Sequence, residues 1–241
     1  MAVAKSPSRM TTDERRQAIL DAVRKVFAEK GFHGATTREL AEVSGVSEAL
    51  LFKHFPTKEA IYNEVQQALW QEITSQDLER LMNLPASTES LVALVRYLVA
   101  RILQCKTVVP PTGPTYMEQL MLRSLLEDGS FARGMLKRFE QTWVTKFVEC
   151  VSAAREEGTL VEMAVPDGFR GWLVHDMAVM TMIQMLPDPP AAGHGLDRDQ
   201  LIRHSVSFAL RGIGLRDDVV RALNPPGAAL GFPTSPEEAR P

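Results

Sequence analysis

Between residues 11 and 56 the sequence marks the starts of three helices in quick succession. Thr11 with Glu14, and Thr36 with Glu39, have the spacing of capping boxes, in which each side chain satisfies a free backbone amide at a helix start. Ser47 is a third residue of the type that caps helices. These signals predict three short helices within the first quarter of the chain, which leaves room for only tight turns between them.

Glycine and proline mark where these helices end. Gly31 is expected to close the first helix in a left-handed conformation, which glycine adopts without steric cost. A second helix is predicted to run through Ser44, with Gly45 forming the turn that follows. The third helix is expected to reach about Phe55, where Pro56 stops it.

The rest of the chain shows helical periodicity, and no stretch of four or more residues alternates apolar and polar side chains as a strand would. Thr57 is expected to cap a long helix that Pro85 ends, if it has not ended earlier. The predicted class is all-α with about nine helices, and the later ones cover residues 89–105, 114–127, 130–157, 167–186 and 197–214. Hydrophobic residues make up 45% of the sequence, enough for a buried core.

The second and third helices have the pattern of a helix-turn-helix, in which the second helix of the pair enters the major groove of DNA. Small Ala41 suits the crossing point and Gly45 the turn, while Leu40, Val46 and Leu51 provide an apolar face. Residues 36–60, TTRELAEVSGVSEALLFKHFPTKEA, resemble the DNA-binding segment of the TetR family of bacterial repressors. The resemblance covers roughly residues 11–60 and is strongest from Thr37 to Lys58.

The resemblance implies a two-part organisation. Residues 1–56 would form the helix-turn-helix domain with a flexible N-terminal arm, and residues 57–223 a helical domain for ligand binding and dimerisation. Residues 224–241, which contain several Pro, Gly and Ala, are expected to be a disordered tail. The implied protein is a cytoplasmic, non-enzymatic, homodimeric regulator without a cofactor. It would be a repressor that leaves a palindromic double-stranded operator when a small, mainly apolar effector binds.

The resemblance also implies roles for residues of the head. Thr37 would contact a phosphate at a helix N-terminus, His54 and Lys58 would hold the DNA backbone, and four residues would face the groove: Ser47, Glu48, Ala49 and Leu50. Lys53 lies where its charge would meet a phosphate. The sequence departs from the family pattern at Phe52, where a tyrosine is usual, and at Ala49, where glycine or another small residue is frequent. Losing the phenol removes one phosphate hydrogen bond.

Each of these assignments has a plainer alternative. Glu48 could accept a hydrogen bond from cytosine N4, or it could be an acidic residue favoured in the first turn of a helix. His54 could pack within the domain, and Lys53 and Lys58 could be solvated charges. Lys5 and Arg9 could form a basic arm for the minor groove, although a disordered terminus explains them as well.

The larger domain supplies candidates for a ligand pocket and a dimer interface. Met and aromatic side chains of the middle helices suit an apolar ligand, although the same residue types more often belong to the core. The pocket candidates are Tyr116, Met117, Leu120, Met121, Trp143, Phe147 and Met177. The resemblance implies a four-helix interface from the last two long helices, with candidates Trp172, Val179, Met180, Ile183, Leu201, Val206 and Leu210.

Charge and composition restrict the alternatives only in part. The formal net charge of −3 divides into +2 over residues 1–60 and −5 over the remainder, which permits DNA binding without demonstrating it. Cys105 and Cys150 have no metal-site or redox spacing, and a reducing cytoplasm is inferred. No metal site is expected; His175 with Asp176, and His204, are interpreted as ordinary hydrogen-bonding residues. An enzyme without recognisable motifs, and an interaction protein that has lost DNA binding, remain the alternatives.

Overall fold

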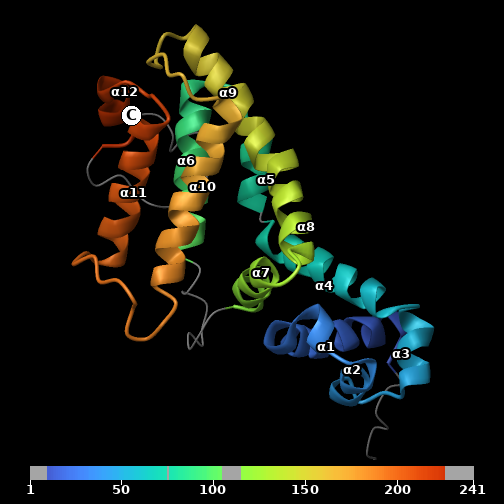
Figure 1. The fold of residues 1–241 in the computed structure, drawn as a ribbon. Coiled ribbons are helices and arrows are strands. Elements are labelled where there is room, and N and C mark those ends of the chain that lie inside the picture. The colour runs from blue at the N-terminus through green and yellow to red at the C-terminus, as the bar shows by residue number, and fades with distance from the viewer. Residues whose placement is uncertain (1–9, 75, 105–114, 226–241) are drawn as a thin grey trace, which may run out of the picture. The chain divides into compact units, whose positions relative to one another are not determined.

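A computed structural model describes residues 10–74, 76–104 and 115–225. Within these residues the chain forms twelve α-helices and one π-helical turn, which confirms the predicted all-α class (Figure 1). The described backbone contains one isolated antiparallel bridge, between Leu160 and Leu215. The chain divides into two compact units, each with its own hydrophobic core.

The first unit begins with the predicted head. Its elements are α1 (Thr12–Gly34), α2 (Thr37–Val43), α3 (Glu48–His54), α4 (Lys58–Ile73), α7 (Tyr116–Leu126) and the first part of α8 (Ser130–Phe139). Both predicted capping boxes are present, at Thr11 with Glu14 and at Thr36 with Glu39. The Thr57 hydroxyl accepts a hydrogen bond from the amide of Ala60 at 3.1 Å, as its predicted capping role requires.

Gly31 has φ of 71° and ψ of −179°, a conformation essentially restricted to glycine but different from the left-handed helical one predicted for it. The helical segment then resumes and continues to Gly34. A side chain at this glycine would collide with the carboxylate of Glu127, because a Cβ there would lie 2.6 Å from Oε2. The close approach comes from α7, which packs along α1 and donates a hydrogen bond from Arg123 Nε to the carbonyl of Ala28 at 3.3 Å. Gly31 is therefore needed for both its backbone conformation and its size.

The core of the first unit forms where α1 meets α3, α4 and α7. Helix α1 buries the apolar side chains of Ile19, Val23, Val26 and Phe27, and the following segments bury Leu51, Phe55 and Ile61. Phe27 and Tyr62 contact each other edge to face with ring centroids 4.9 Å apart. Burial raises the pKa of the Tyr62 phenol to about 12, and the charges of nearby carboxylates add to this effect.

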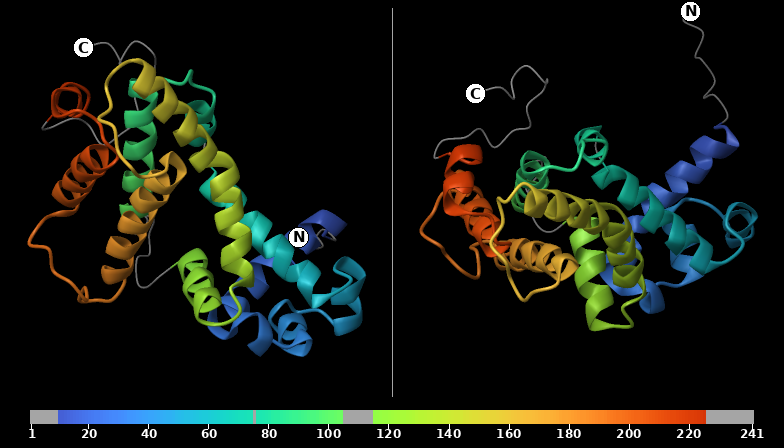
Figure 2. Two further views of the ribbon diagram at one scale, coloured as in Figure 1. Left: turned by 45° about the horizontal axis from the view of Figure 1, so that its top comes forward. Right: turned by 90° about the horizontal axis from the view of Figure 1, so that it is seen from above.

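The second unit is built around α6, which packs against α9, α10 and α11 (Figure 2). Its elements are α5 (Gln76–Met82), α6 (Thr88–Leu103), the remainder of α8, the π-helical turn η1 (Glu140–Val144), α9 (Thr145–Glu156), α10 (Asp167–Gln184), α11 (Arg198–Gly212) and α12 (Asp217–Leu223). Helix α6 presents an apolar surface on most sides and is buried over most of its length. It therefore forms the centre of this core.

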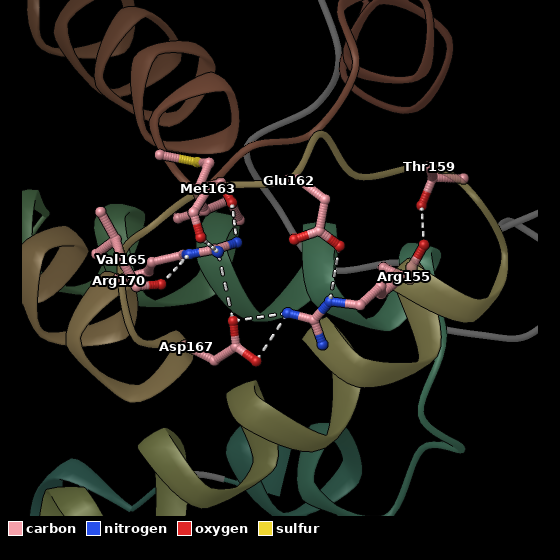
Figure 3. Close-up of polar contacts among 9 residues, drawn as sticks. Arg155, Thr159, Glu162, Met163, Val165, Asp167 and Arg170 are labelled. Carbon is pink, nitrogen blue, oxygen red and sulfur yellow. Dashed lines mark hydrogen bonds and ion pairs between the residues drawn. The ribbon is translucent and has the colours of Figure 1, made fainter.

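A buried arginine holds together the connection between α9 and α10 (Figure 3). Arg170 is 3% exposed and donates hydrogen bonds to the carbonyl oxygens of Met163, Val165 and Ile213, at 3.1, 3.0 and 3.1 Å. Asp167 lies 3.5 Å from its guanidinium, and both carboxylate oxygens of Asp167 accept from Nη2 of Arg155, at 2.8 and 2.9 Å. The guanidinium thus satisfies carbonyls of the α9–α10 connection and of the end of α11.

The predicted helix count of about nine is too low for the described residues. Helix α12 was not predicted, and the long helix expected from Thr57 towards Pro85 is interrupted, because α4 ends at Ile73 and α5 follows as a separate helix. Seven residues are too few for periodicity alone to establish a separate helix. The predicted helix 130–157 is continuous but changes to π-helical hydrogen bonding over Glu140–Val144. The other helix ends lie within a few residues of the predicted ones.

Several sequence predictions lie outside the described residues. These are the arm containing Lys5 and Arg9, the linker preceding Thr115, the role of Cys105, and the tail from residue 226 onward. The proposed boundary between residues 56 and 57 is a functional division and stays a prediction. Among the residues that the structure does describe, no helix combines the length and apolarity that crossing a membrane requires.

Candidate nucleic-acid interface

Helix α3 has one face buried in the head and one face exposed. Leu51 and the following Phe55 are fully buried, which fixes how the helix is rotated about its axis. The opposite side exposes five of the predicted DNA-contacting residues, namely Ser47, Glu48, Ala49, Phe52 and Lys53. Leu50, at the margin of this group, is half-buried. The hydroxyl of Ser47 accepts from the amide of Leu50 at 3.2 Å, so this side chain caps the helix.

Two features hold α3 in this position. Gly45 has φ of 63° and makes the turn, after which the amide of Val46 donates to the carbonyl of Ala41 at 3.0 Å. At the other end, Arg16 of α1 lies 4.3 Å above the ring of Phe55 and donates to the backbone carbonyl of His54. The exposed face is thus supported from beneath by the buried one.

The first residues of α2 and α3 are joined by a hydrogen bond. The hydroxyl Oγ1 of Thr37 donates to Oε2 of Glu48 at 2.8 Å, and Glu48 is exposed. Arg38 lies beside this pair; its pKa is raised mainly by the hydrogen bond to Glu42 and additionally by the charge of Glu48. The sequence analysis missed Arg38 as a candidate, although a basic residue directly after Thr37 was a visible signal.

Lys58 and His54, which were predicted to hold the DNA backbone, are both half-buried. The ammonium of Lys58 donates to the carbonyl of Ala35 at 2.8 Å and lies 4.4 Å from the centroid of the Phe32 ring. Lys58 therefore has a structural role at the end of α1, and it is not simply a solvated charge. His54 is half-buried, with its ring 6.5 Å from that of Phe55.

A second charged contact stabilises the start of α2. Lys30 Nζ donates to Oε1 of Glu39 at 2.5 Å, while Oε2 of the same carboxylate accepts from the amide of Thr36 at 3.0 Å. The hydrogen bond from Lys30, followed by those from Thr36, lowers the pKa of Glu39 to about 2. This carboxylate therefore stays charged well below neutral pH and holds α2 against α1.

The predicted pocket residues belong to two different cores. Tyr116, Met117, Leu120 and Met121 lie on α7 in the first unit, where Leu120 is buried and Tyr116 is exposed. The other three lie in the second unit, where Trp143 and Phe147 are buried and Met177 is half-buried. Three of the pocket candidates are therefore core residues in this structure: Leu120, Trp143 and Phe147.

The predicted interface residues divide in a similar way. Leu201, Val206 and Leu210 of α11 are buried in the core of their own chain, so these three side chains are not free for a partner. On α10, Trp172, Val179 and Ile183 are half-buried, and Met180 is exposed. The large apolar residues exposed on these two helices are Phe169, Leu173, Met180 and Phe208, of which only Met180 was a predicted interface residue.

The polar residues singled out by the sequence outside the head are His175 with Asp176, His204 and Cys150. Nδ1 of His175 lies 2.9 Å from Oδ1 of Asp176, and His204 is exposed. Cys150 is buried, which raises the pKa of its thiol. Throughout the described part of the chain, no three His, Cys, Asp or Glu side chains gather as a metal site would require.

Comparison with known proteins places the head among regulatory proteins. The profile of the family described as "Bacterial regulatory proteins, tetR family" matches residues 19–65. Among curated proteins, the chain is 32% identical over 124 residues to the HTH-type transcriptional repressor Rv1474c of Mycobacterium tuberculosis. That match covers 52% of this chain and 58% of the repressor.

Other curated relatives match over the head alone. The HTH-type transcriptional activator FasR of Mycolicibacterium smegmatis is 40% identical over 60 residues, 25% of this chain and 27% of FasR. The HTH-type transcriptional repressor AcnR of Corynebacterium diphtheriae is 48% identical over 48 residues, 20% of this chain and 25% of AcnR. The aligned parts thus span less than two thirds of each of these relatives.

Solved structures share the fold over most of the chain at low identity. A regulatory protein of the tetR family from Rhodococcus RHA1 has a TM-score of 0.59 with 17% identity, covering 85% of this chain and 99% of that one. AibR, solved in complex with isovaleryl coenzyme A and operator DNA, has a TM-score of 0.56 with 20% identity, covering 81% and 97%. These likenesses extend the shared fold beyond the head.

Proposed function

We propose that this chain binds a specific operator DNA as a homodimer and regulates transcription from it. Through its N-terminal domain the chain belongs to the TetR family of bacterial regulatory proteins. Members of this family are regulators and not enzymes, so the enzyme alternative is set aside. The proposed direction is repression, relieved when a small, mainly apolar effector binds. Such a protein would act in the bacterial cytoplasm, where the chromosome lies.

The observation that carries this proposal is the exposed face of α3. A reading helix needs one side buried for support and the other free to enter the major groove. Helix α3 meets both conditions, because Leu51 is buried and Glu48, Phe52 and Lys53 are exposed. The exposed phenyl of Phe52 offers apolar contact but no hydrogen bond to a phosphate, so Lys53 is the more important backbone contact of the two.

The test begins with selection of duplexes from a randomised DNA library by the purified full-length chain. Binding to the enriched duplex is then measured by fluorescence anisotropy at two salt concentrations, against a scrambled competitor. We expect competitor-resistant binding that weakens as salt rises, because phosphate contacts release counterions. Lys53→Ala should weaken binding to all duplexes alike and reduce the salt slope by about 1.

Enrichment of no sequence above the scrambled duplex would refute specific DNA binding. The remaining alternative would then be a helical interaction protein that keeps the head without reading DNA. A circular dichroism spectrum with the helical content of the fold would accompany this measurement, so that misfolded protein does not produce the same result.

We propose that the dimer forms through the exposed faces of α10 and α11. Phe169, Leu173 and Met180 are four and seven residues apart and so share one side of α10, while Phe208 on α11 is 70% exposed. Isolated exposed apolar residues are common, but a row of large ones along a helix is typical of an interface. The proposed interface therefore includes Met180 but not Leu201, Val206 or Leu210.

Sedimentation of variants tests this interface. Phe208→Glu should shift the protein towards monomer, because it places a charge where two apolar surfaces would meet. Leu126→Glu is the matched control, since Leu126 is exposed on α7 of the first unit and has no place in the proposed interface. A dimer that tolerates Phe208→Glu as well as Leu126→Glu would refute the assignment.

We propose that the effector site includes the aromatic cluster of the second unit. Trp143 stacks on Phe139 and Phe147, with ring centroids 5.3 and 5.1 Å apart. Its indole nitrogen is buried and has no hydrogen-bond partner among the described residues, which is costly unless a ligand supplies an acceptor. Trp143 also lies in the π-helical turn, a feature that often occurs at functional sites.

The expected effector is therefore mainly apolar with one hydrogen-bond acceptor. A thermal-shift screen of apolar carboxylic acids, ketones and esters would identify compounds that raise the melting temperature and release the selected duplex. Trp143→Phe, which keeps an aromatic ring and removes the donor, should reduce that shift, whereas Trp172→Phe is the control. An equal response of both variants would argue against the role of the Trp143 indole nitrogen.

A further inference from the structure

The hydrogen bond between Thr37 and Glu48 joins two residues that have no capping role. Thr36 and Ser47 already cap α2 and α3 through their own hydroxyls. Thr37 and Glu48 are the first residues inside these helices, and their side chains meet at the surface with Oγ1 and Oε2 2.8 Å apart. This contact is therefore not needed to start either helix.

The donor capacity of a hydroxyl limits what Thr37 can do. A threonine hydroxyl has one hydrogen to donate, and a phosphate oxygen only accepts. While Thr37 donates to Glu48, its hydroxyl cannot also donate to a DNA phosphate. The role implied by family resemblance, a phosphate contact from this side chain, therefore competes with the contact that the structure shows.

Glu48 can still accept further hydrogen bonds while it is bound to Thr37. A carboxylate has about four acceptor positions, and the bond from Thr37 occupies one of them. Glu48 is exposed on the face of α3 that would enter the groove, where phosphate would repel it and an amino group of a base would attract it. Arg38 lies close enough to feel its charge. Fixing a flexible side chain before binding also reduces the entropy lost when DNA binds.

We propose that Thr37 is a positioning residue for DNA specificity, which holds the Glu48 carboxylate in place as the acceptor for the N4 amino group of one cytosine in the operator. The inference rests on the proposed DNA-binding function and adds to it a base and a division of labour. Glu48 contacts the base, and Thr37 acts through Glu48 without contacting the base itself.

The experiment uses the full-length protein and the duplex that it enriches from a randomised library. Each C·G pair of a half-site is replaced in turn by T·A, and affinities are measured by anisotropy for wild type, Thr37→Val, Thr37→Ser and Glu48→Ala. The wild type should discriminate about tenfold at one of these positions, and Glu48→Ala should abolish that preference. Thr37→Val, which keeps the shape and removes the donor, should lose most of it.

Two further results are expected from the same series. Thr37→Ser keeps the hydroxyl and should keep the preference for cytosine. The double variant Thr37→Val with Glu48→Ala should discriminate no worse than Glu48→Ala alone, because the two residues act through one contact. Glu48 is exposed and Thr37 is half-buried, and substitutions at either position leave the caps at Thr36 and Ser47 intact, so melting temperatures should stay close to that of the wild type.

A uniform loss of affinity for every duplex in Thr37→Val, together with a shallower salt dependence, would show a phosphate contact and overturn the inference. So would a Thr37→Ser variant that behaves like Thr37→Val. Both outcomes would leave the proposed DNA-binding function standing. Failure of the wild type to enrich any sequence would instead overturn the proposed function, and the inference with it.

Discussion

The surface of the head and the connection between α9 and α10 use polar side chains differently. In the head, Glu48 is exposed and pairs with the hydroxyl of Thr37, while the side chain of Arg38 is 82% exposed. At the α9–α10 connection, Arg170 is almost fully buried and binds three backbone carbonyls. The exposed contacts of the head can be exchanged for contacts with a ligand. The contacts of Arg170 cannot be lost without unfolding the residues around it.

Magnitudes explain the difference. An exposed ion pair or hydrogen bond contributes about 0–1 kcal/mol, because water replaces either partner at little cost. A buried carbonyl left without its donor costs about 1–3 kcal/mol. Arg170 serves three carbonyls, of which the bond to Ile213 is buried and the bonds to Met163 and Val165 are partly buried. The surface proposed to bind and release DNA is therefore built from weak contacts that water can replace, whereas the connection in the second unit is held by contacts that are costly to break.

The largest expected effect is that of Arg170→Met. The variant keeps much of the side-chain volume but leaves the carbonyls of Met163, Val165 and Ile213 without a donor, so it should lose about 3 kcal/mol or more of unfolding free energy. Urea denaturation followed by circular dichroism measures this. Arg155→Met is the control, because it removes a partly exposed pair with Asp167. Equal losses in the two variants would break the comparison.

Gly31→Ala should have the next largest effect. A residue with a Cβ held at the φ of 71° and ψ of −179° found at Gly31 costs about 1–3 kcal/mol, and here the new methyl would also displace the ends of Glu127 and Arg123. Gly34→Ala is the matched control, since its φ is not in the left-handed region and its nearest neighbour, Cβ of Lys30, lies at 3.4 Å. The two unfolding free energies, compared by urea titration, should differ by at least the conformational cost.

Lys58→Ala tests whether a predicted DNA contact also supports the fold. Loss of the bond to the Ala35 carbonyl and of the contact with the Phe32 ring should lower the unfolding free energy by about 1 kcal/mol. Lys53→Ala, at an exposed position of α3, should leave it unchanged. Thermal melts without DNA separate the two effects from DNA binding. If both variants melt with the wild type, Lys58 contributes no measurable support to the head.

The smallest expected effect is a pH-dependent one at Glu39. Its pKa is lowered to about 2 chiefly by the hydrogen bond from Lys30. The charged form therefore stabilises the fold above the unfolded pKa near 4.5, and this contribution is lost as pH falls towards 2. Glu39→Gln preserves the capping geometry but not the charge. The melting-temperature difference between wild type and variant should shrink below pH 4.5; a difference constant from pH 6 to 3 would refute the charge effect.

Much of the head was predictable because its signals are local. The capping boxes at Thr11 and Thr36, the positive φ angles at Gly31 and Gly45, and the cap at Thr57 each depend on a few neighbouring residues. The pocket and interface candidates were harder. Periodicity identified Leu201, Val206 and Leu210 as a buried face but could not say which chain buries them, and the structure places them in their own core.

By itself, the sequence determined the helical class, the helix boundaries of the head and its resemblance to a family, since caps, turns and periodicity act within one or two helical turns. Tertiary structure alone decided that Arg170 would serve carbonyls as far away as Ile213, that Lys58 would bind Ala35, and that Thr37 would pair with Glu48. These contacts join residues 11 to 43 positions apart. They form only after hydrophobic burial has brought separate helices together, so no local pattern records them.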